Sequence, residues 1–365
     1  MILTIIVFVL ILGLLIFSHE FGHFVSAKKA GMKVEEFGFG FPPRIFGIKK
    51  GETLYSLNLI PIGGFVKIHG QDGPQEGKKR LKKDKRAFYS RPIWQRAIVL
   101  AMGVIMNLFL AAVLLSIVHG IGIPTIIGAD STQVKNAQIQ IVEVAQNSPA
   151  EEVGLKIGDS IKEFSIFNSQ FLINEVEDVQ RLVARYAGEE ITLVIKRGNE
   201  TLEKTLIPRI SPPEEEGPIG IALAKVGIVK HSWYAAIWQG FKTTGELTIT
   251  FVGLFYQLFK TLIVRGELME EVAGPVGIAV LTSQITKLGL VYILQFAALI
   301  SINLAIINII PFPALDGGRL LFLAIEKIKK SPVSAKIERT VNGIGFALLI
   351  GLMILVTFRD IAKLF

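Results

Sequence analysis

The sequence predicts a polytopic α-helical membrane protein with about four transmembrane helices, a membrane-reentrant β-loop and an inserted extracytoplasmic α+β domain. Composition is the first observation: 51% of the 365 residues are hydrophobic and the mean hydropathy is +0.52, values typical of membrane proteins. The second is the length of the apolar runs. A membrane helix needs about 20 mostly apolar residues, and such runs occupy residues 2–25, 97–118, 288–307 and 344–358.

These patterns divide the chain into consecutive segments. We expect a first transmembrane helix, a cytoplasmic loop with the reentrant β-hairpin, a second transmembrane helix, the inserted domain, an amphipathic membrane-surface region, a third transmembrane helix, a second cytoplasmic loop and a fourth transmembrane helix. In the same order, the segments are residues 1–26, 27–92, 93–120, 128–224, 230–287, 288–318, 319–341 and 342–365.

The distribution of positive charge predicts the orientation. The formal net charge is +8, and Lys and Arg crowd residues 28–96 and 319–339, between apolar runs. The first run has no Lys or Arg before it and no cleavage pattern of small residues after it, so we expect a permanent helix rather than a secretory signal. Cytoplasmic loops are enriched in Lys and Arg. Both termini and the inserted domain are therefore expected outside the cytoplasm.

Residues 35–69 differ from both a span and an ordinary loop. Gly and Pro residues interrupt an extended, apolar stretch that includes residues 54–62. Strand formers with such breaks predict a hairpin or looped sheet. Irregular backbone enters a membrane only where protein or a wet cavity satisfies its polar groups, so a cytoplasmic surface hairpin is the alternative.

The inserted domain shows the strand and helix patterns that are typical of a small α+β fold. Residues 140–144 and 191–195 predict strands, and residues 177–186 predict a helix. The segment Ser148-Pro-Ala-Glu-Glu-Val-Gly-Leu-Lys-Ile-Gly-Asp159 between them resembles the corresponding stretch of PDZ domains. We place the folded part at residues 138–210 and expect residues 211–218 to be a linker.

The segment 233–264 is ambiguous. It is apolar, but it carries Lys242, Glu246 and Lys260. We expect an amphipathic stretch on the outer membrane surface. A further pair of spans is the alternative.

The motif His19-Glu-Phe-Gly-His23 predicts a metal site at the end of the first span. On a helix, histidines four residues apart share one face and can bind one metal ion, while Glu20 beside them can act as general base. The chain has no cysteine, so ligands must come from His and carboxylate groups. The alternative is a set of polar residues that ends the span. Charged groups at membrane depth are costly unless they serve a function.

A third ligand is expected because catalytic zinc commonly has three protein ligands and one open position. Asp316 is the candidate, in Asn308-Ile-Ile-Pro-Phe-Pro-Ala-Leu-Asp-Gly-Gly318 directly after the third apolar run. Pro311 and Pro313 exclude a regular helix there. Because a helical stretch follows at residues 319–328, a helix N-cap is the alternative role for Asp316.

Together these motifs resemble the site-2 proteases, and more closely the bacterial regulator of sigma-E protease group, which has a PDZ insertion. The likeness extends over essentially the whole chain. It includes four further segments, Glu36-Phe-Gly-Phe-Gly-Phe-Pro-Pro43, Pro61-Ile-Gly-Gly-Phe-Val-Lys67, Gly274-Pro-Val-Gly-Ile278 and Leu321-Phe-Leu-Ala-Ile-Glu-Lys327. Two departures are visible. Val104 stands where the family usually has Pro, and one PDZ-like module is seen where some members carry two.

The resemblance implies a role for each matching residue. His19, His23 and Asp316 would bind zinc, and Glu20 would be the catalytic base. Two groups of residues would contact the substrate. One is Asn308, Pro311 and Pro313 near Asp316, and the other is Leu57, Asn58 and Leu59 on the reentrant β-loop.

The implied activity is cleavage of transmembrane segments in single-span proteins, as in regulated intramembrane proteolysis of anti-sigma factors or removal of signal-peptide remnants. Its partners would be such substrates, trimmed beforehand by another protease, and the lipid of the bacterial inner membrane. Nucleic acid is not expected, because the basic run at residues 78–86 lacks interleaved aromatic residues. The rival hypothesis is a non-catalytic scaffold that binds chain ends through the PDZ-like module. An intact Glu20 argues against it.

Overall fold

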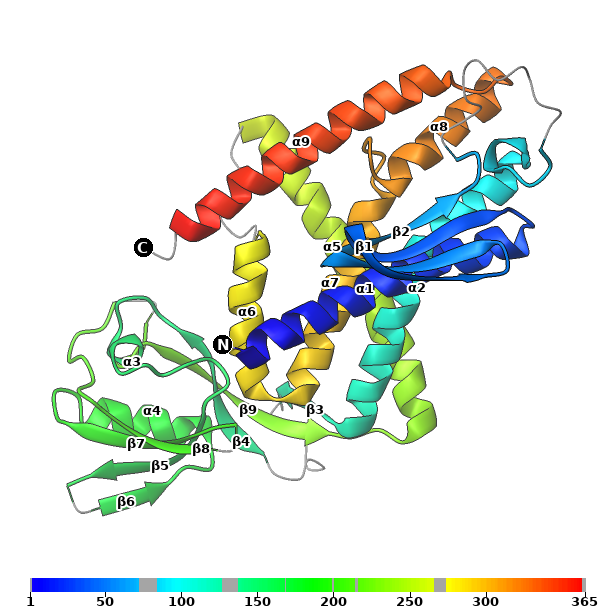
Figure 1. Ribbon diagram of the computed structural model, residues 1–365. Helices are drawn as coiled ribbons and strands as arrows, with labels where there is room; N and C mark the ends of the chain where they lie inside the picture. Colours follow the sequence, from blue (N-terminus) through cyan, green and yellow to red (C-terminus); the bar gives the residue numbers. More distant parts are fainter. Residues whose placement is uncertain are drawn as a thin grey trace. The chain divides into compact units, whose positions relative to one another are not determined.

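The computed structural model describes residues 2–71, 84–126, 137–167, 169–198, 200–213, 216–265 and 274–362 (Figure 1). Most of the basic run 78–86, the start of the expected domain 128–224 and residues 266–273 of the expected surface region lie outside these residues. The chain forms two compact units. One comprises Met1–Ser116, Ile237–Thr286 and Ile293–Phe365, and the other comprises Ile117–Ala236 and Lys287–Tyr292.

Four helices of the described residues are long and apolar enough to cross a membrane, which confirms a polytopic membrane protein. They are α1 (Ile2–Lys29), α2 (Ile93–Ile121), α7 (Leu290–Ile309) and α9 (Ala335–Ala362). Helix α9 begins at Ala335, before the expected start at residue 342. Its first turns carry Lys336, Glu338 and Arg339. These residues favour a helix, but their charges are not typical of a membrane span.

Helices α1, α2 and α7 share one apolar core. The buried members are Ile11 and Leu15 from α1, Ala111, Leu114 and Leu115 from α2, and Ala297, Ala298, Ile302 and Ile306 from α7. Two hydroxyl groups add hydrogen bonds between these helices. Ser18 Oγ donates to the Met106 carbonyl at 3.1 Å, and Ser301 Oγ donates to the Asn107 carbonyl at 2.8 Å. Small residues and hydroxyl bonds are typical of helix contacts in membranes.

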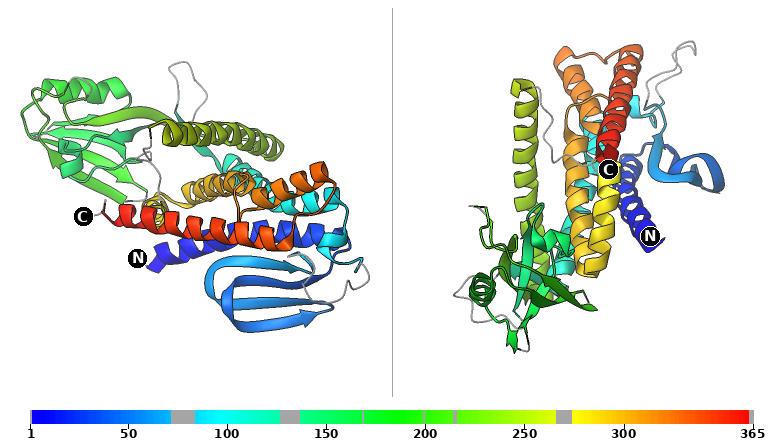
Figure 2. Two further views of the ribbon diagram at one scale, coloured as in Figure 1. Left: turned by 90° about the horizontal axis from the view of Figure 1, so that it is seen from above. Right: turned by 90° about the vertical axis from the view of Figure 1, so that its left-hand side faces the viewer.

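Strands β1 (Val34–Lys50) and β2 (Thr53–Ile68) form an antiparallel hairpin that folds back on itself and packs against α1 (Figure 2). Residues 53–57 of β2 lie between residues 46–50 and 36–39 of β1, and residues 36–39 in turn pair with residues 64–67. The described segments therefore follow the order 46–50, 53–57, 36–39, 64–68. Within the described residues, segment 64–68 has a paired neighbour on one side only, which makes it an edge.

The remaining elements of this unit are four helices. They are the short η1 (Phe88–Ser90), α5 (Trp233–Arg265), α6 (Pro275–Leu288) and α8 (Asp316–Lys329). Helix α5 is one continuous helix, and it is not among the four candidate spans. The start of α6 is held by α9, because the backbone N–H groups of Gly274 and Gly277 donate to the Asp360 carboxylate at 3.2 and 2.7 Å.

The second unit is built on an antiparallel sheet with strand order β3-β9-β4-β5-β7-β8, and β6 pairs with β5. The strands are β3 (Ile123–Ile126), β4 (Gln138–Val144), β5 (Ser160–Ile166), β6 (Ser169–Leu172), β7 (Ile191–Arg197), β8 (Glu200–Leu206) and β9 (Ile221–Val229). Two helices accompany them, α3 (Pro149–Glu152) and α4 (Val176–Arg185). The strands expected at 140–144 and 191–195 and the helix expected at 177–186 are confirmed.

The sheet extends beyond the expected end at residue 210. Strand β9 follows residues 211–218 and pairs with both β4 and β3. The Pro- and Glu-rich segment is therefore a loop inside the unit and not a linker that leaves it. Composition could not reveal this, because a solvated loop and a linker use the same residues. The strand signal of Ile221–Val229 was weakened by its Ala and Gly residues.

Candidate metal centre

Helix α1 and the start of α8 bring three potential ligands together. His19 and His23 are one turn apart on α1, and Asp316 is the first residue of α8. Asp316 Oδ2 lies 3.0 Å from His19 Nε2 and 3.1 Å from His23 Nε2, and the two imidazole nitrogens are 3.1 Å apart. Both histidines are buried. Among the described residues, this is the group of His and acidic side chains that could hold a metal ion.

A backbone carbonyl of α2 fixes the orientation of His23. Its Nδ1 lies 2.7 Å from the Val99 oxygen. A carbonyl oxygen only accepts hydrogen bonds, so Nδ1 of a neutral His23 carries the proton and Nε2 presents a lone pair. That lone pair points to the place where the Asp316 carboxylate and the His19 ring meet.

An amide of the same helix orients His19. The side-chain nitrogen of Asn107 lies 3.5 Å from His19 Nδ1, and the Asn107 oxygen, fully buried, has no hydrogen-bond partner among the described residues. Amide oxygen and nitrogen are assigned from the hydrogen-bond network. With the amide turned over, its oxygen accepts a hydrogen bond from the Nδ1–H group, and Nε2 of His19 is left free to act as a ligand. Partners of this kind fix the tautomer of metal-binding histidines.

The donor set fits zinc. Three atoms with lone pairs that face one another repel unless a cation lies between them. Zinc binds imidazole nitrogen at about 2.0–2.1 Å, so two tetrahedral ligands are about 3.3 Å apart. The separations of 3.0–3.1 Å among the three atoms are close to that spacing. Two nitrogens and one carboxylate oxygen also leave one coordination position for water or substrate.

The loop between α7 and α8 aims Asp316 at the histidines. The N-cap of α8 is Leu315, and no side-chain capping bond is made, so the structure does not use Asp316 as a cap. The chain packs so tightly here that a Cβ at Gly317 or Gly318 would collide with backbone oxygens of the loop. From α9, the Asn342 side-chain oxygen accepts a hydrogen bond from the Ala314 N–H at 3.1 Å. Ala314 has a φ of +76°, a strained conformation that this bond helps to hold.

A cavity of about 550 Å³ opens beside the three ligands. Its lining includes Glu20, Asn308 and Arg319, together with residues 63–66 of β2. The Glu20 side chain passes close to Gly64, where a Cβ would come within 3.2 Å of Glu20 Cγ. One wall is therefore the edge segment of the hairpin, and the general-base candidate lies between that edge and the metal ligands.

The other expected substrate residues have different surroundings. Asn308 lines the cavity, whereas Pro311 and Pro313 lie in the loop outside its lining, and Pro313 packs against Gly345 of α9. On the hairpin, Leu57 and Leu59 are exposed, and the Asn58 side chain donates to the Gly40 carbonyl at 2.9 Å. None of these three lines the cavity. Segment 63–66 does so instead, because the hairpin folds back and presents its last strand to α1.

Sequence reasoning missed Arg319 and the supporting roles of Val99 and Asn342. Arg319 follows the Leu-Asp-Gly motif and could have been noticed as a charge close to the candidate ligand. A backbone carbonyl such as that of Val99 leaves no signal in the sequence. Asn107 could have been noticed as a polar residue within the second apolar run.

Comparison with known proteins agrees with this geometry. The model of peptidase family M50 matches residues 7–352. A protein of Clostridium perfringens whose name describes it as a zinc metalloprotease is 37% identical over 349 residues, which is 95% of each chain. The regulator of sigma-W protease RasP of Bacillus subtilis is 31% identical, with 99% of each chain covered. The zinc metalloprotease RasP of Shouchella clausii is 30% identical, again with 99% coverage of both chains.

The family match covers most of the chain, and the relatives share its full length. The His19 and His23 imidazoles and the Asp316 carboxylate meet in space and could hold a metal ion. The chain therefore belongs to peptidase family M50, the site-2 protease family, and is a zinc metalloprotease of the membrane.

Proposed function

We propose that this enzyme is an intramembrane endopeptidase that cleaves transmembrane segments of single-span membrane proteins. One observation carries the proposal. Glu20 and two of the three ligands, His19 and His23, lie on an apolar helix long enough to span a membrane, and the cavity beside them is walled by α1, the β2 edge and the loop after α7. A membrane-anchored enzyme for soluble substrates would instead carry its site in a hydrophilic domain.

Each site residue has a separate task in this proposal. His19, His23 and Asp316 hold zinc, and Asn107 and the Val99 carbonyl keep the imidazoles in the ligand tautomer. Zinc, when bound, polarises a peptide carbonyl and lowers the pKa of water in the site. Glu20 accepts the proton of the attacking water and later delivers it to the leaving amine. Arg319 adds a positive charge to the cavity that offsets negative charge on the reacting carbonyl.

A helical substrate must unwind before it can be cut, because its peptide carbonyls are hydrogen-bonded within the helix. Extended backbone in apolar surroundings then needs new partners. Segment 64–68, the open edge of the hairpin, offers backbone groups for strand addition beside Glu20. Asn308 on the opposite side of the cavity can bond the substrate backbone through its amide. In this proposal the hairpin is the membrane-reentrant element, and Leu57, Asn58 and Leu59 shape it rather than the cleavage site.

The proposed location is the bacterial cytoplasmic membrane, with both termini and the sheet unit outside the cytoplasm. The bias of Lys and Arg supports this orientation, since Lys28 and Lys29 end α1. The segments 27–92 and 319–341 then lie on the cytoplasmic side. Helix α5 does not lie apart on the outer surface as the sequence suggested, because Leu247, Phe251 and Phe255 pack against the core shared by α1, α2 and α7.

The sheet unit is proposed to act as a PDZ-like module that recognises chain ends. Strand β9 pairs with β4 through residues 221–226 and with β3 through residues 226–229. Residues 221–225 of β9 pair with β4 on one side. On their other side they have no paired strand among the described residues. This edge directly follows the Gly217-Pro-Ile-Gly220 turn, and Lys225 is ion-paired with Glu175 at the start of α4. An open edge beside a helix is the feature that PDZ domains use for strand addition.

A filter for pre-trimmed membrane proteins is the function we propose for this module. The relative from Bacillus subtilis is named as a regulator of sigma-W, and we extend that type of substrate, an anti-sigma factor, to this chain. The alternative of a non-catalytic scaffold would use the same module. It would have no need for Glu20 or for three converging ligands.

The first test distinguishes the role of Glu20 as general base from the role of Asp316 as zinc ligand. We expect Glu20→Gln to keep zinc and to lower cleavage of a model single-span substrate by about 10²–10⁴-fold, because only the proton acceptor is removed. Asp316→Ala should lower the zinc content of the purified protein. Cleavage near the wild-type rate in the Glu20 variant contradicts the catalytic assignment, and full zinc content in the Asp316 variant contradicts the ligand assignment.

The orienting role of Asn107 can be measured without catalysis. Asn107→Leu should weaken zinc binding by about 10- to 100-fold in a competition with a chelator, as for other groups that orient metal-binding histidines. Asn303→Leu is the matched control, since it makes the same change at an exposed position of α7 that does not line the cavity. Equal zinc affinity in wild type and the Asn107 variant would contradict the proposed role of the Asn107 amide in orienting His19.

The orientation can be tested with single cysteines, because the chain has none. Ser169 in β6 and Ser331 after α8 are both exposed. We expect an impermeant thiol reagent to label Ser169→Cys in intact cells and Ser331→Cys only after permeabilisation. The reverse pattern would invert the proposed topology.

The role of the module can be tested by its removal. Ile123 and Val229 are directly paired across β3 and β9, so a short Gly-Ser link can replace residues 123–229. If the module excludes bulky substrates, the shortened enzyme should cut untrimmed substrates as well as trimmed ones. If it recognises chain ends, cleavage of trimmed substrates should slow instead. Unchanged rate and selectivity with zinc retained would refute both versions.

A further inference from the structure

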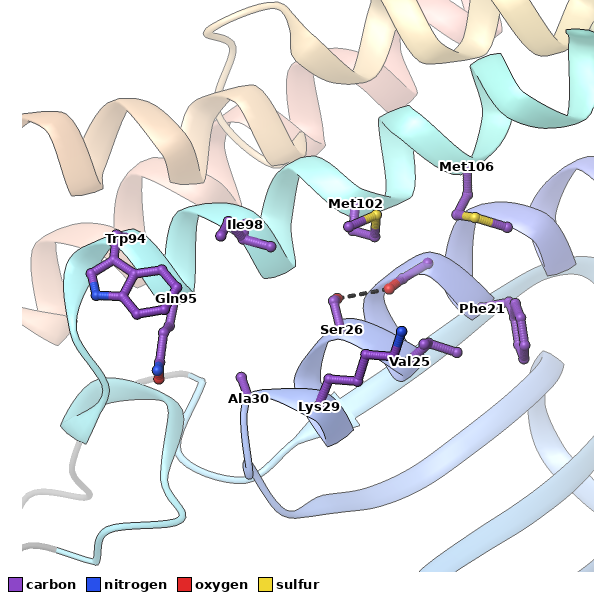
Figure 3. A pocket seen from close by; sticks show the side chains of 11 residues that line it. Phe21, Val25, Ser26, Lys29, Ala30, Trp94, Gln95, Ile98, Met102 and Met106 are labelled. Carbon is purple, nitrogen blue, oxygen red and sulfur yellow. Dashed lines mark hydrogen bonds between the residues drawn. The ribbon is translucent and has the colours of Figure 1, made fainter.

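A second groove lies between α1 and α2 and shares no residue with the catalytic cavity. It has a volume of about 400 Å³. From α1 it is lined by Phe21, Gly22, Val25, Ser26, Lys29 and Ala30, and from α2 by Trp94, Gln95, Ile98, Met102 and Met106 (Figure 3). We propose that this groove binds one anionic phospholipid, with an acyl chain along its apolar walls and the phosphate at Lys29.

The walls suit a hydrocarbon chain. Met102 and Met106 follow one face of α2 (Figure 3), and Phe21 is an aromatic residue of the lining from α1. Methionine and aromatic side chains form adaptable apolar surfaces. The Ser26 hydroxyl already donates to the Gly22 and His23 carbonyls at 2.7 and 3.0 Å. The other uncharged amide or hydroxyl group of the lining is that of Gln95, whose Oε1 has no hydrogen-bond partner among the described residues.

The end of the groove carries one positive charge. The Lys29 side chain runs back over the groove, and its ammonium lies below Met102 (Figure 3). Its neighbour Lys28 is ion-paired with Glu52 at 2.7 Å, whereas Lys29 has no carboxylate within ion-pair distance among the described residues. No acidic residue lines the groove. A cation over an apolar groove, without a protein counter-ion, complements the phosphate of an anionic lipid.

Trp94 marks the level of the membrane interface at this groove. It is 63% exposed and lies at the end of α2 that starts the span, next to the end of α1 that carries Lys29. Tryptophan is enriched where the hydrocarbon region meets the headgroups. The ammonium lies between the methionine wall and the indole (Figure 3), and the flexible Lys29 side chain can extend toward a phosphate at the level of Trp94.

Other occupants fit less well. An extended peptide would bring an N–H and a C=O group at nearly every residue, and most of the lining side chains are apolar and offer no partner for them. A helix of a second copy of the chain would bury the Lys29 ammonium without a partner, which is costly in a membrane. An anionic lipid satisfies both the apolar surface and the charge.

Lipid binding can be measured on the full-length protein in detergent by native mass spectrometry, with dioleoyl phosphatidylglycerol and dioleoyl phosphatidylcholine as probes. We expect wild type to prefer the anionic lipid. Lys29→Gln should weaken phosphatidylglycerol binding by about fivefold, the value of one basic residue at a membrane surface, and should leave phosphatidylcholine binding unchanged. The control is Lys330→Gln, which removes the same charge from an exposed residue after α8 and should have no effect.

A second variant tests the groove itself. Ile98 is 46% exposed, so Ile98→Trp can fill the space without entering the core. It should reduce retention of the anionic lipid, while zinc content and thermal unfolding stay as in wild type and show that the fold is kept. Three outcomes would each overturn the proposal. The first is an equal loss of phosphatidylglycerol binding in the Lys29 and Lys330 variants, and the second is full phosphatidylglycerol binding in both Lys29→Gln and Ile98→Trp. The third is a bound mass equal to that of a peptide or a second chain. The measurement needs no cleavage and is independent of the proposed function.

Discussion

The close contact between α1 and α2 is the constraint on which the metal centre depends. A Cβ at Gly22 would meet the backbone of Met102, and a Cβ at Gly103 would meet the rings of His19 and His23. Glycine at both positions lets the two helices approach until α2 can reach the imidazoles. The Val99 carbonyl and the Asn107 amide then fix both rings. The two histidine ligands belong to α1, but α2 decides which of their nitrogens face the metal.

The third ligand reaches this pair through a chain of contacts. Helix α7 is tied to α2 by the hydrogen bond from Ser301 to the Asn107 carbonyl, and the loop after α7 is held by Asn342 of α9. Farther along α8, Glu326 forms a bidentate ion pair with Arg96 of α2 at 2.9 and 2.5 Å. Helix α8 is therefore fixed at both ends, and its first residue is held against His19 and His23. Misplacement of Asp316 by even 1 Å would be costly for a metal centre.

Much of this could be predicted from the sequence because the signals are local. Apolar length indicated the four spans, and the spacing of His19 and His23 on a helix indicated a shared face. What could not be predicted depends on tertiary contacts. The fold-back of the hairpin presents residues 63–66 to the cavity instead of Leu57, Asn58 and Leu59, and no periodicity records it. Val104 replaces a family proline, and α2 runs through it as a continuous helix, because valine keeps the N–H that proline lacks.

The central claim is that two histidines of α1 and one aspartate of α8 bind a single zinc ion. X-ray absorption at the zinc edge of the purified wild-type enzyme tests it most directly. We predict one zinc per chain, four nitrogen or oxygen neighbours at about 2.0–2.2 Å and the scattering of two imidazoles. The chain has five histidines, so the imidazole count is informative. A protein that retains no zinc, or a site with three or more imidazoles, would contradict the account.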